Sequence, residues 1–199
     1  VYAKANTGEF NLDLMGETSF YGPVEADGVL TTAAAQAVKT GDAMAAVTLE
    51  VNGASARGAA LAGLTFVKPT YGTVSRYGIV PLASSFDQAG PMARNIDDLA
   101  MLFGAVCGRD TRDAVTKNYT FEGYGESVKG MKIGVPKEYY GEGVQPAVKE
   151  KVFEAIETLK AQGAEIMEIS LPSTEYALSA YYIICCAEAA SNLGRYDGL

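Results

Sequence analysis

The chain has 199 residues, of which 48% are hydrophobic and 20% are charged, and this is a globular rather than a disordered composition. The formal net charge of −8 argues against a nucleic-acid-binding surface, because phosphate binding needs clustered lysine and arginine. There is no histidine, which excludes Ser-His-Asp and Cys-His catalytic units and histidine-ligated zinc sites within the chain.

The first fifty residues carry alternating extended and helical patterns. Val1–Lys4 is a strand candidate, and Gly8–Val24 is expected to be rich in loops because glycine and proline interrupt it. The alanine-rich stretch Thr31–Thr40 predicts a helix that stops at Gly41. The apolar and β-branched residues of Ala45–Val51 predict a buried strand.

The middle of the chain predicts one well-marked helix. Lys68–Leu82 contains only short extended pieces, which proline and glycine separate. Asn95 is the predicted N-cap, with Asp98 in the first turn, where the helix dipole favours a carboxylate. Apolar residues then recur at helical spacing as far as Gly108, where the helix is expected to end. These apolar residues are Ile96, Leu99, Phe103 and Val106.

A strand, a helix and a second strand follow in order. Met131–Val135 predicts a buried strand, Gln145–Gln162 a helix, and Ala164–Leu171 a strand with alternating apolar residues. The two strands should therefore be parallel, which makes residues 131–171 a βαβ unit. The buried stripe expected on the helix consists of Val148, Val152, Ile156 and Leu159.

The last predicted element is a long, largely buried helix over Thr174–Asn192, with Tyr176, Ile183 and Ile184 near one face. Alternating strands and helices of this kind predict an α/β fold. We expect a single, partial domain over residues 1–199.

The three cysteines, Cys107, Cys185 and Cys186, have neither a metal-binding spacing nor a disulfide framework. They are expected to be free, mostly buried thiols in a reducing compartment, the cytoplasm. No uninterrupted apolar run approaches about 18 residues, so no membrane span is expected.

Two long segments carry a resemblance to a known family. Lys68–Asp113 reads KPTYGTVSRYGIVPLASSFDQAGPMARNIDDLAMLFGAVCGRDTRD. Val128–Gly198 opens with VKGMKIGVPKEYYGEGVQP and closes with STEYALSAYYIICCAEAASNLGRYDG. A weaker match, AKANTGEF and then ETSFYGP, lies within Val1–Pro23. The chain thereby resembles the amidase-signature family, in the form found in the A subunit of glutamyl-tRNA(Gln) amidotransferase.

The resemblance implies a fragment of the amidase-signature fold, with a mixed, largely parallel sheet covered by helices. It also implies a Ser–cis-Ser–Lys triad that hydrolyses glutamine and passes ammonia to a partner subunit, which activates Glu-tRNA(Gln) with ATP. ATP and magnesium would belong to that partner's reaction, so no cofactor is expected in this chain.

By resemblance, Gly53-Ala54-Ser55-Ala56-Arg57 matches the family's nucleophile motif, with Ala54 in place of one glycine. Ser55 is therefore the nucleophile candidate, and Gly53, Ala54 and Arg57 are candidate substrate-binding residues. The alternative is that Ser55 is an ordinary N-cap serine.

The other two members of the triad match less well. An ungapped alignment from Ser55 puts Thr31 at the cis-serine position, and a shift by one residue puts Leu30 there. The family's flanking glycines are replaced, so Thr31 and Thr32 are more simply interpreted as caps of the alanine-rich helix. The base lysine of the family would lie upstream of Val1, and no residue of this chain matches it.

Four further residues have both a functional and a structural interpretation. Asp87 and Arg94 are a candidate charged pair, but hydrogen bonds that fix a loop are the expected role. By resemblance Tyr182, with Tyr181, is a candidate for a substrate pocket, although aromatic residues at helical spacing usually belong to the core. Two functions follow: an amidase-family enzyme incomplete in this chain, or a non-catalytic scaffold or interaction module.

Overall fold

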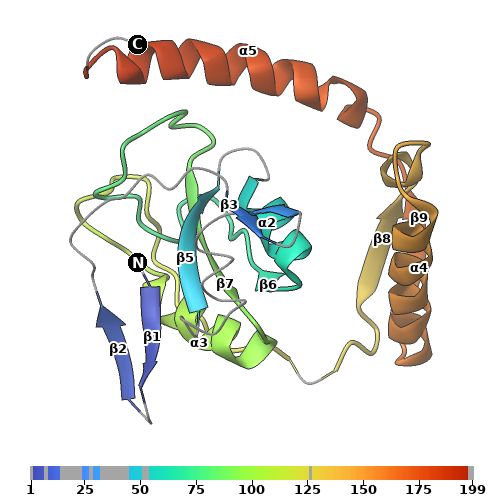
Figure 1. Cartoon of the computed structure of the whole chain (residues 1–199). Coiled ribbons are helices and arrows are strands. Elements are labelled where there is room, and N and C mark those ends of the chain that lie inside the picture. The colour runs from blue at the N-terminus through green and yellow to red at the C-terminus, as the bar shows by residue number, and fades with distance from the viewer. Residues whose placement is uncertain are drawn as a thin grey trace. The chain divides into compact units, whose positions relative to one another are not determined.

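The computed structural model describes the backbone of residues 2–6, 9–13, 24–26, 29–31, 45–50, 54–125 and 127–196, and the side chains of residues 47, 56–125 and 127–196. The chain forms two compact units (Figure 1). The larger unit consists of Val1–Gly123 and Cys185–Leu199, and the smaller unit is Tyr124–Ile184.

The larger unit is built on a five-stranded sheet in the order β2-β1-β5-β7-β6. All described pairings in this sheet are antiparallel. The mixed helix-and-strand α/β fold is confirmed, but parallel pairing among the described strands occurs in the smaller unit. The five strands are β1 (Tyr2–Asn6), β2 (Glu9–Asp13), β5 (Ala45–Glu50), β6 (Thr65–Phe66) and β7 (Gln88–Ala93).

The N-terminal predictions are confirmed only in part. The strand expected at Val1–Lys4 is β1, but it pairs with β2, so the loop-rich prediction for Gly8–Val24 is wrong for β2. The helix start predicted at Thr31 is also wrong, because Thr31 ends strand β4 (Val29–Thr31), which pairs with β3 (Val24–Ala26). Valine and threonine are β-branched and favour an extended backbone. Residues 32–40 of the predicted helix lie outside the described residues.

The core of the larger unit lies between β7 and helix α3 (Ile96–Val106). Met92 and Ala93 in β7 are fully buried, and Ala93 packs with Leu99 and Leu102 of α3. The strand predicted at Ala45–Val51 is β5, which pairs with β7 along its whole length, and its one described side chain, Val47, is half-buried.

The predicted cap of α3 is confirmed. Asn95 Oδ1 accepts a hydrogen bond from the backbone N–H of Asp98 at 2.8 Å. At the other end Cys107 is the C-cap, and Gly108 has a φ of +125°, which favours glycine. Helix α3 therefore begins and ends where the local sequence predicts.

The smaller unit contains the predicted βαβ unit. Strands β8 (Lys132–Pro136) and β9 (Glu165–Ile169) are parallel, and helix α4 (Pro146–Ala161) lies between them in the chain. The 3-10 turn η1 (Lys137–Tyr140) follows β8. The helix predicted at Gln145–Gln162 is therefore confirmed, with these two residues as its N-cap and C-cap.

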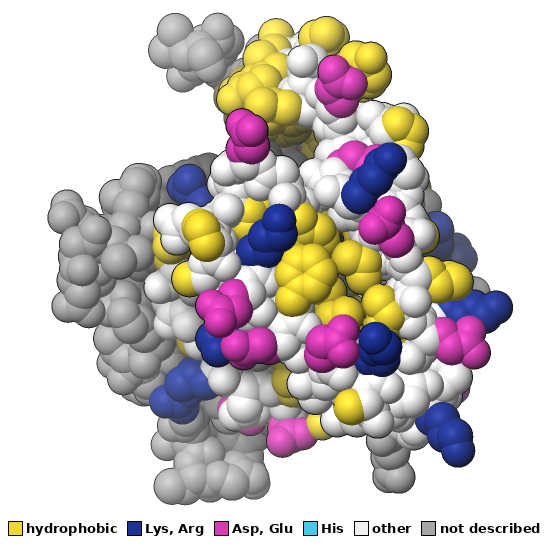
Figure 2. Space-filling model, turned by 90° about the vertical axis from the view of Figure 1, so that its right-hand side faces the viewer, with side chains coloured by type: hydrophobic (Ala, Val, Ile, Leu, Met, Phe, Trp, Pro, Cys, Tyr) yellow, Lys and Arg dark blue, Asp and Glu magenta, His cyan; other side chains and the backbone are white. Residues whose placement is uncertain are grey.

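The burial predicted for this region is wrong. No residue of α4 is buried, and Val148 in its predicted stripe is 52% exposed. Helix α5 (Thr174–Leu193) buries Cys185 alone among its residues, and Ile183 is 73% exposed. Figure 2 shows hydrophobic side chains at the surface among charged ones. Periodicity identifies an apolar face, but burial depends on which other segments cover it.

Two sequence expectations concern α5 and the cysteines. Within the part of the chain that the structure describes, no helix combines the length and apolar character needed to cross a bilayer. The three cysteines are free, as predicted, although only Cys185 is buried, while Cys107 is half-buried and Cys186 is exposed.

Candidate functional site

The nucleophile candidate Ser55 lies in the first turn of helix α2 (Ala54–Ala62). The helix begins one residue before it, so Ser55 is not the N-cap that the structural interpretation expects. Gly53 and the side chains of Ala54 and Ser55 lie outside the described parts of the chain. Arg57, the third candidate for substrate binding, is exposed.

The elements that carry Thr31 and Ser55 lie side by side, because α2 contacts β4 as well as β5 and β6. Thr31 is the last residue of β4, in extended conformation. No cis peptide bond occurs among the described residues, which include Leu30 and Thr31. The fold thus brings together the two segments that the resemblance assigns to the nucleophile and to the cis-serine position.

Tyr182 belongs to the smaller unit, and its side chain is 58% exposed. Its ring contacts that of Tyr181, with centroids 5.2 Å apart. Neither tyrosine belongs to a buried core, so the structural interpretation is wrong for Tyr182. Its substrate-binding role remains a prediction.

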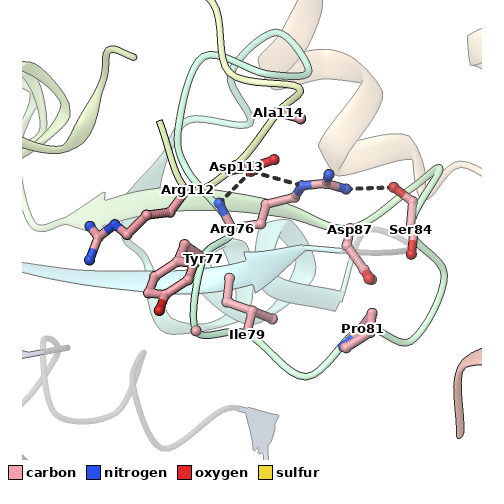
Figure 3. Close-up of a pocket in the computed structure, with 10 residues that line it drawn as sticks. Arg76, Tyr77, Ile79, Pro81, Ser84, Asp87, Arg112, Asp113 and Ala114 are labelled. Carbon is pink, nitrogen blue, oxygen red and sulfur yellow. Dashed lines mark hydrogen bonds and ion pairs between the residues drawn. The ribbon is translucent and has the colours of Figure 1, made fainter. Parts of the chain in front are cut away.

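A pocket of about 290 Å³ opens in the larger unit (Figure 3). Sequence reasoning did not single it out, although all of its residues but one lie within the segment that carries the resemblance, and their charges are visible there. The lining residues are Arg76, Tyr77, Gly78, Ile79, Pro81, Ser84, Asp87, Arg112, Asp113 and Ala114.

Arg76 organises one side of this pocket. Its Nη1 donates to the carbonyl oxygen of Ser84 at 2.6 Å and to the hydroxyl of Tyr71 at 2.8 Å. Its Nε lies 3.4 Å from Asp113 Oδ2, which also accepts the backbone N–H of Arg76 at 2.9 Å. The guanidinium stacks on the Tyr71 ring, 4.9 Å from its centroid. Arg76 is therefore held in one orientation by hydrogen bonds and stacking.

The electrostatics around Asp113 follow from these contacts. Burial raises the pKa of Asp113, but backbone N–H groups of Arg76 and Val115 and the Arg76 guanidinium lower it more, so the pKa lies below its usual value. The carboxylate stays charged at neutral pH, and its negative charge balances the positive charge of Arg76 at the pocket wall.

Asp87 has the structural role that the sequence analysis expects. It is 2% exposed and accepts the backbone N–H groups of Leu82 at 3.0 Å and of Ala83 at 3.3 Å. Arg94 is exposed, and no ion pair joins it to Asp87 in the described part of the chain. Asp87 therefore shapes the loop that precedes β7.

The charged groups lining the pocket are already engaged with other protein groups. Arg76 is bound to Asp113, Arg112 is bound to Asp110, and Asp87 is bound to backbone amides. The pocket is thus built to hold the shape of its walls, and the candidate nucleophile is not among its lining residues.

Comparison with known proteins places this geometry in a family. The model of the family described as Amidase matches residues 33–199, which include Ser55 and the whole pocket but not Thr31. The chain belongs to the amidase family. The matched range includes most of the larger unit and the whole of the smaller unit, while residues 1–32 lie outside it.

Individual proteins of the family show which of its members this chain is similar to. The A subunit of glutamyl-tRNA(Gln) amidotransferase from Alkalilimnicola ehrlichii is 48% identical over 98% of this chain, and the chain spans 43% of that protein's length. A crystal structure of the same subunit from Thermotoga maritima is 38% identical, with a TM-score of 0.76 over 82% of this chain and 37% of its own. The peptide amidase of Stenotrophomonas maltophilia is 29% identical, with a TM-score of 0.65 over 82% of this chain and 35% of its own.

Proposed function

We propose that this amidase-family chain corresponds to the nucleophile-bearing part of a glutamine-hydrolysing amidotransferase subunit. The observation that carries the proposal is the 48% identity to an amidotransferase A subunit over 98% of the chain. The structural comparison supports it, because the amidotransferase structure from Thermotoga maritima fits better than the peptide amidase in both identity and TM-score.

In the proposed reaction Ser55 attacks the carboxamide carbon of glutamine and releases ammonia. A lysine acting through the cis-serine position takes the Ser55 proton and returns it to the leaving group. Water then hydrolyses the acyl-enzyme. The ammonia passes to partner subunits that activate Glu-tRNA(Gln) with ATP and magnesium, so this chain needs no cofactor. We expect the assembly to work in the cytoplasm.

The second candidate function is a non-catalytic amidase-like scaffold or interaction module. The observation that favours it is Thr31, which stands in a regular strand where the resemblance calls for a glycine-flanked cis-serine. The base lysine of the family would lie upstream of Val1, so it favours neither candidate. The two candidates predict different results once a base lysine is supplied.

A chimeric subunit can supply the base lysine. Residues 54–199 replace the matching stretch of the Alkalilimnicola ehrlichii A subunit, which keeps its own upstream segment and its partner subunits. A second chimera carries residues 1–199. We expect the first chimera to release ammonia from glutamine and form Gln-tRNA(Gln), and its Ser55→Ala variant to lose both activities. We expect the second chimera to be much weaker, since it carries Thr31.

These results separate the candidates. If the first chimera assembles with the partner subunits but its ammonia release does not depend on Ser55, the enzymatic proposal is wrong. Assembly without activity in both chimeras would favour the scaffold. A glutamine-independent amidase activity on peptide amides would instead assign the segment to the peptide amidase branch.

A further inference from the structure

Side chains of helix α5 form hydrogen bonds to a loop that lies more than one hundred residues earlier in the sequence. Glu188 accepts the backbone N–H of Ser85 at 2.9 Å through Oε2, and it also accepts the Ser85 hydroxyl through Oε1. One helical turn later, Asn192 Nδ2 donates to the carbonyl oxygen of Leu82 at 3.2 Å and lies 3.3 Å from Ser84 Oγ. We call residues 82–85 the clamped loop.

The same loop is held from within the larger unit. Its Ser84 carbonyl oxygen accepts from Arg76 Nη1 at 2.6 Å and from the Tyr71 hydroxyl at 2.7 Å. Its first two N–H groups donate to Asp87. Most of these contacts come from side chains, and the Ala83 carbonyl oxygen accepts the backbone N–H groups of Phe86 and Asp87 at 2.8 Å each. The conformation of the loop therefore depends on these side chains as well as on its own backbone turn.

The sheet register relates the clamped loop to helix α2, which carries the candidate nucleophile. The loop leads through Asp87 into β7, whose first residue, Gln88, pairs with Glu50, the last residue of β5. Paired residues of antiparallel strands lie about 5 Å apart at their Cα atoms. Four residues after Glu50 the chain enters α2, whose second residue is Ser55. The clamped loop and the start of α2 therefore lie at the same end of the strands β5 and β7.

We propose that Glu188 and Asn192 are positioning residues that hold the clamped loop in place next to Ser55. This inference rests on the proposed function, because it assigns a role at the site of glutamine hydrolysis. Glu188 acts through Ser85 and Asn192 acts through Leu82 and Ser84, so neither needs to touch the substrate. Helix α5 thereby becomes part of the support of the active site.

The carboxylate of Glu188 suits this role. Hydrogen bonds from the hydroxyl and the N–H of Ser85 lower the pKa of Glu188 below its usual value, so it is ionised at neutral pH. A charged acceptor strengthens both hydrogen bonds. A glutamine at this position keeps the length of the side chain and one acceptor oxygen, whereas an alanine removes both contacts.

The first test measures amide hydrogen exchange by NMR on the chain itself. Glu188→Ala should speed exchange of the Ser85 N–H by about tenfold or more, because a hydrogen bond to a charged group is lost. Glu188→Gln should lie between Glu188→Ala and the parent. The Asp98 N–H, which donates to Asn95 at the start of α3, has no hydrogen bond to Glu188 and should not change. Glu175→Ala removes an exposed acid of the same helix and serves as the matched control.

An unchanged Ser85 exchange rate in Glu188→Ala, with Asp98 protected, would overturn the clamp. If Glu188→Ala also exposes Asp98, the milder Glu188→Gln variant decides the matter. Faster exchange confined to Ser85 and its neighbours supports the clamp, and an exchange rate equal to that of the parent contradicts it.

The second test uses the chimera that carries residues 54–199, together with its partner subunits. Glu188→Ala should lower kcat for ammonia release by about 10- to 100-fold with a smaller change in KM, because displacement of the clamped loop misplaces the reacting groups. Glu188→Gln should recover part of kcat, and Glu175→Ala should leave it unchanged. Equal kcat in Glu188→Ala and the parent chimera would overturn the positioning role.

The two proposals fail in different ways. An unmodified chimera without Ser55-dependent ammonia release contradicts the proposed function, and the positioning role at that site then falls with it. An active chimera that does not respond to Glu188→Ala contradicts the positioning role alone. The exchange rate of the Ser85 amide decides in either case whether the clamp itself exists.

Discussion

Asp110 and Arg112 form a two-pronged ion pair on the surface of the larger unit. Arg112 Nε donates to Oδ1 of Asp110 at 3.0 Å, and Nη2 donates to Oδ2 at 3.1 Å. The guanidinium also stacks on the ring of Tyr77, with its central carbon 4.3 Å from the ring centroid. Asp110 further accepts the Ser75 hydroxyl at 2.9 Å. These contacts tie the 110–113 turn to the pocket wall.

The pair predicts a pH dependence. Hydrogen bonds from the Arg112 guanidinium, the Arg112 backbone N–H and the Ser75 hydroxyl lower the pKa of Asp110 from 3.8 to about 2. Because the folded-state pKa is depressed, the stabilisation is present above pH 3.8 and is lost as the pH falls toward 2. In Arg112→Gln the pKa of Asp110 should rise toward its usual value. An NMR titration of the carboxyl carbon measures it.

The control for this titration is Arg109→Gln, which removes an exposed arginine next to Asp110 in the sequence. Arg109→Gln should leave the Asp110 titration where it is in the parent chain. A pKa of Asp110 that does not move in Arg112→Gln would show that Ser75 and the backbone N–H account for the shift.

The core between α3 and β7 predicts a contrast between two neighbouring residues. Leu102 is 1% exposed and packs on Ala93, whereas Met101 is 56% exposed on the same helix. Leu102→Ala should lower the free energy of unfolding by about 2–5 kcal/mol, because it leaves a cavity. Met101→Ala should change it by about 0.5 kcal/mol or less. Urea unfolding followed by tyrosine fluorescence checks both, since the chain has no tryptophan. Equal losses would contradict the burial of Leu102 between α3 and β7.

Two glycines with left-handed backbones predict a second contrast. Gly72 has a φ of +83° and Gly78 a φ of +87°, so alanine at either position costs about 1–2 kcal/mol in backbone strain. An added Cβ at Gly72 would also meet the carbonyl oxygen of Val115, whereas the space around Gly78 is open. Gly72→Ala should therefore be less stable than Gly78→Ala by about 1–3 kcal/mol. Thermal unfolding of the two variants measures the difference, and equal midpoints would mean that the 115–117 segment moves aside.

We expect the isolated chain to show no turnover of glutamine. General-base assistance is worth about 10²–10⁴ in rate, and no residue here matches the base lysine of the family. Purified chain should release no more ammonia from glutamine than its Ser55→Ala variant, which also controls for contaminating amidases. Ser55-dependent ammonia release would show that another lysine has taken the role, and Lys4, Lys39 and Lys68 are then the residues to mutate.

Local chemistry was enough to predict several elements of this fold. The Asn95 cap, the strand–helix–strand order of residues 131–171 and its parallel pairing follow from capping residues and apolar periodicity, which act over a few neighbouring residues. The loop-fixing role of Asp87 was also predictable, because a carboxylate next to turn residues usually binds backbone N–H groups.

Amidase-family membership, the choice of Ser55 as nucleophile candidate and the order of the elements α3, β8, α4, β9 and α5 could be read from the residues alone, because motifs and periodicity are local properties. The folded chain was needed to show that Thr31 lies in a strand, that the apolar faces of α4 and α5 stay exposed, and that Glu188 binds Ser85. The strand order of the larger sheet, burial and a contact across 103 residues depend on segments far apart in the chain, and a local pattern does not specify which of those segments will meet.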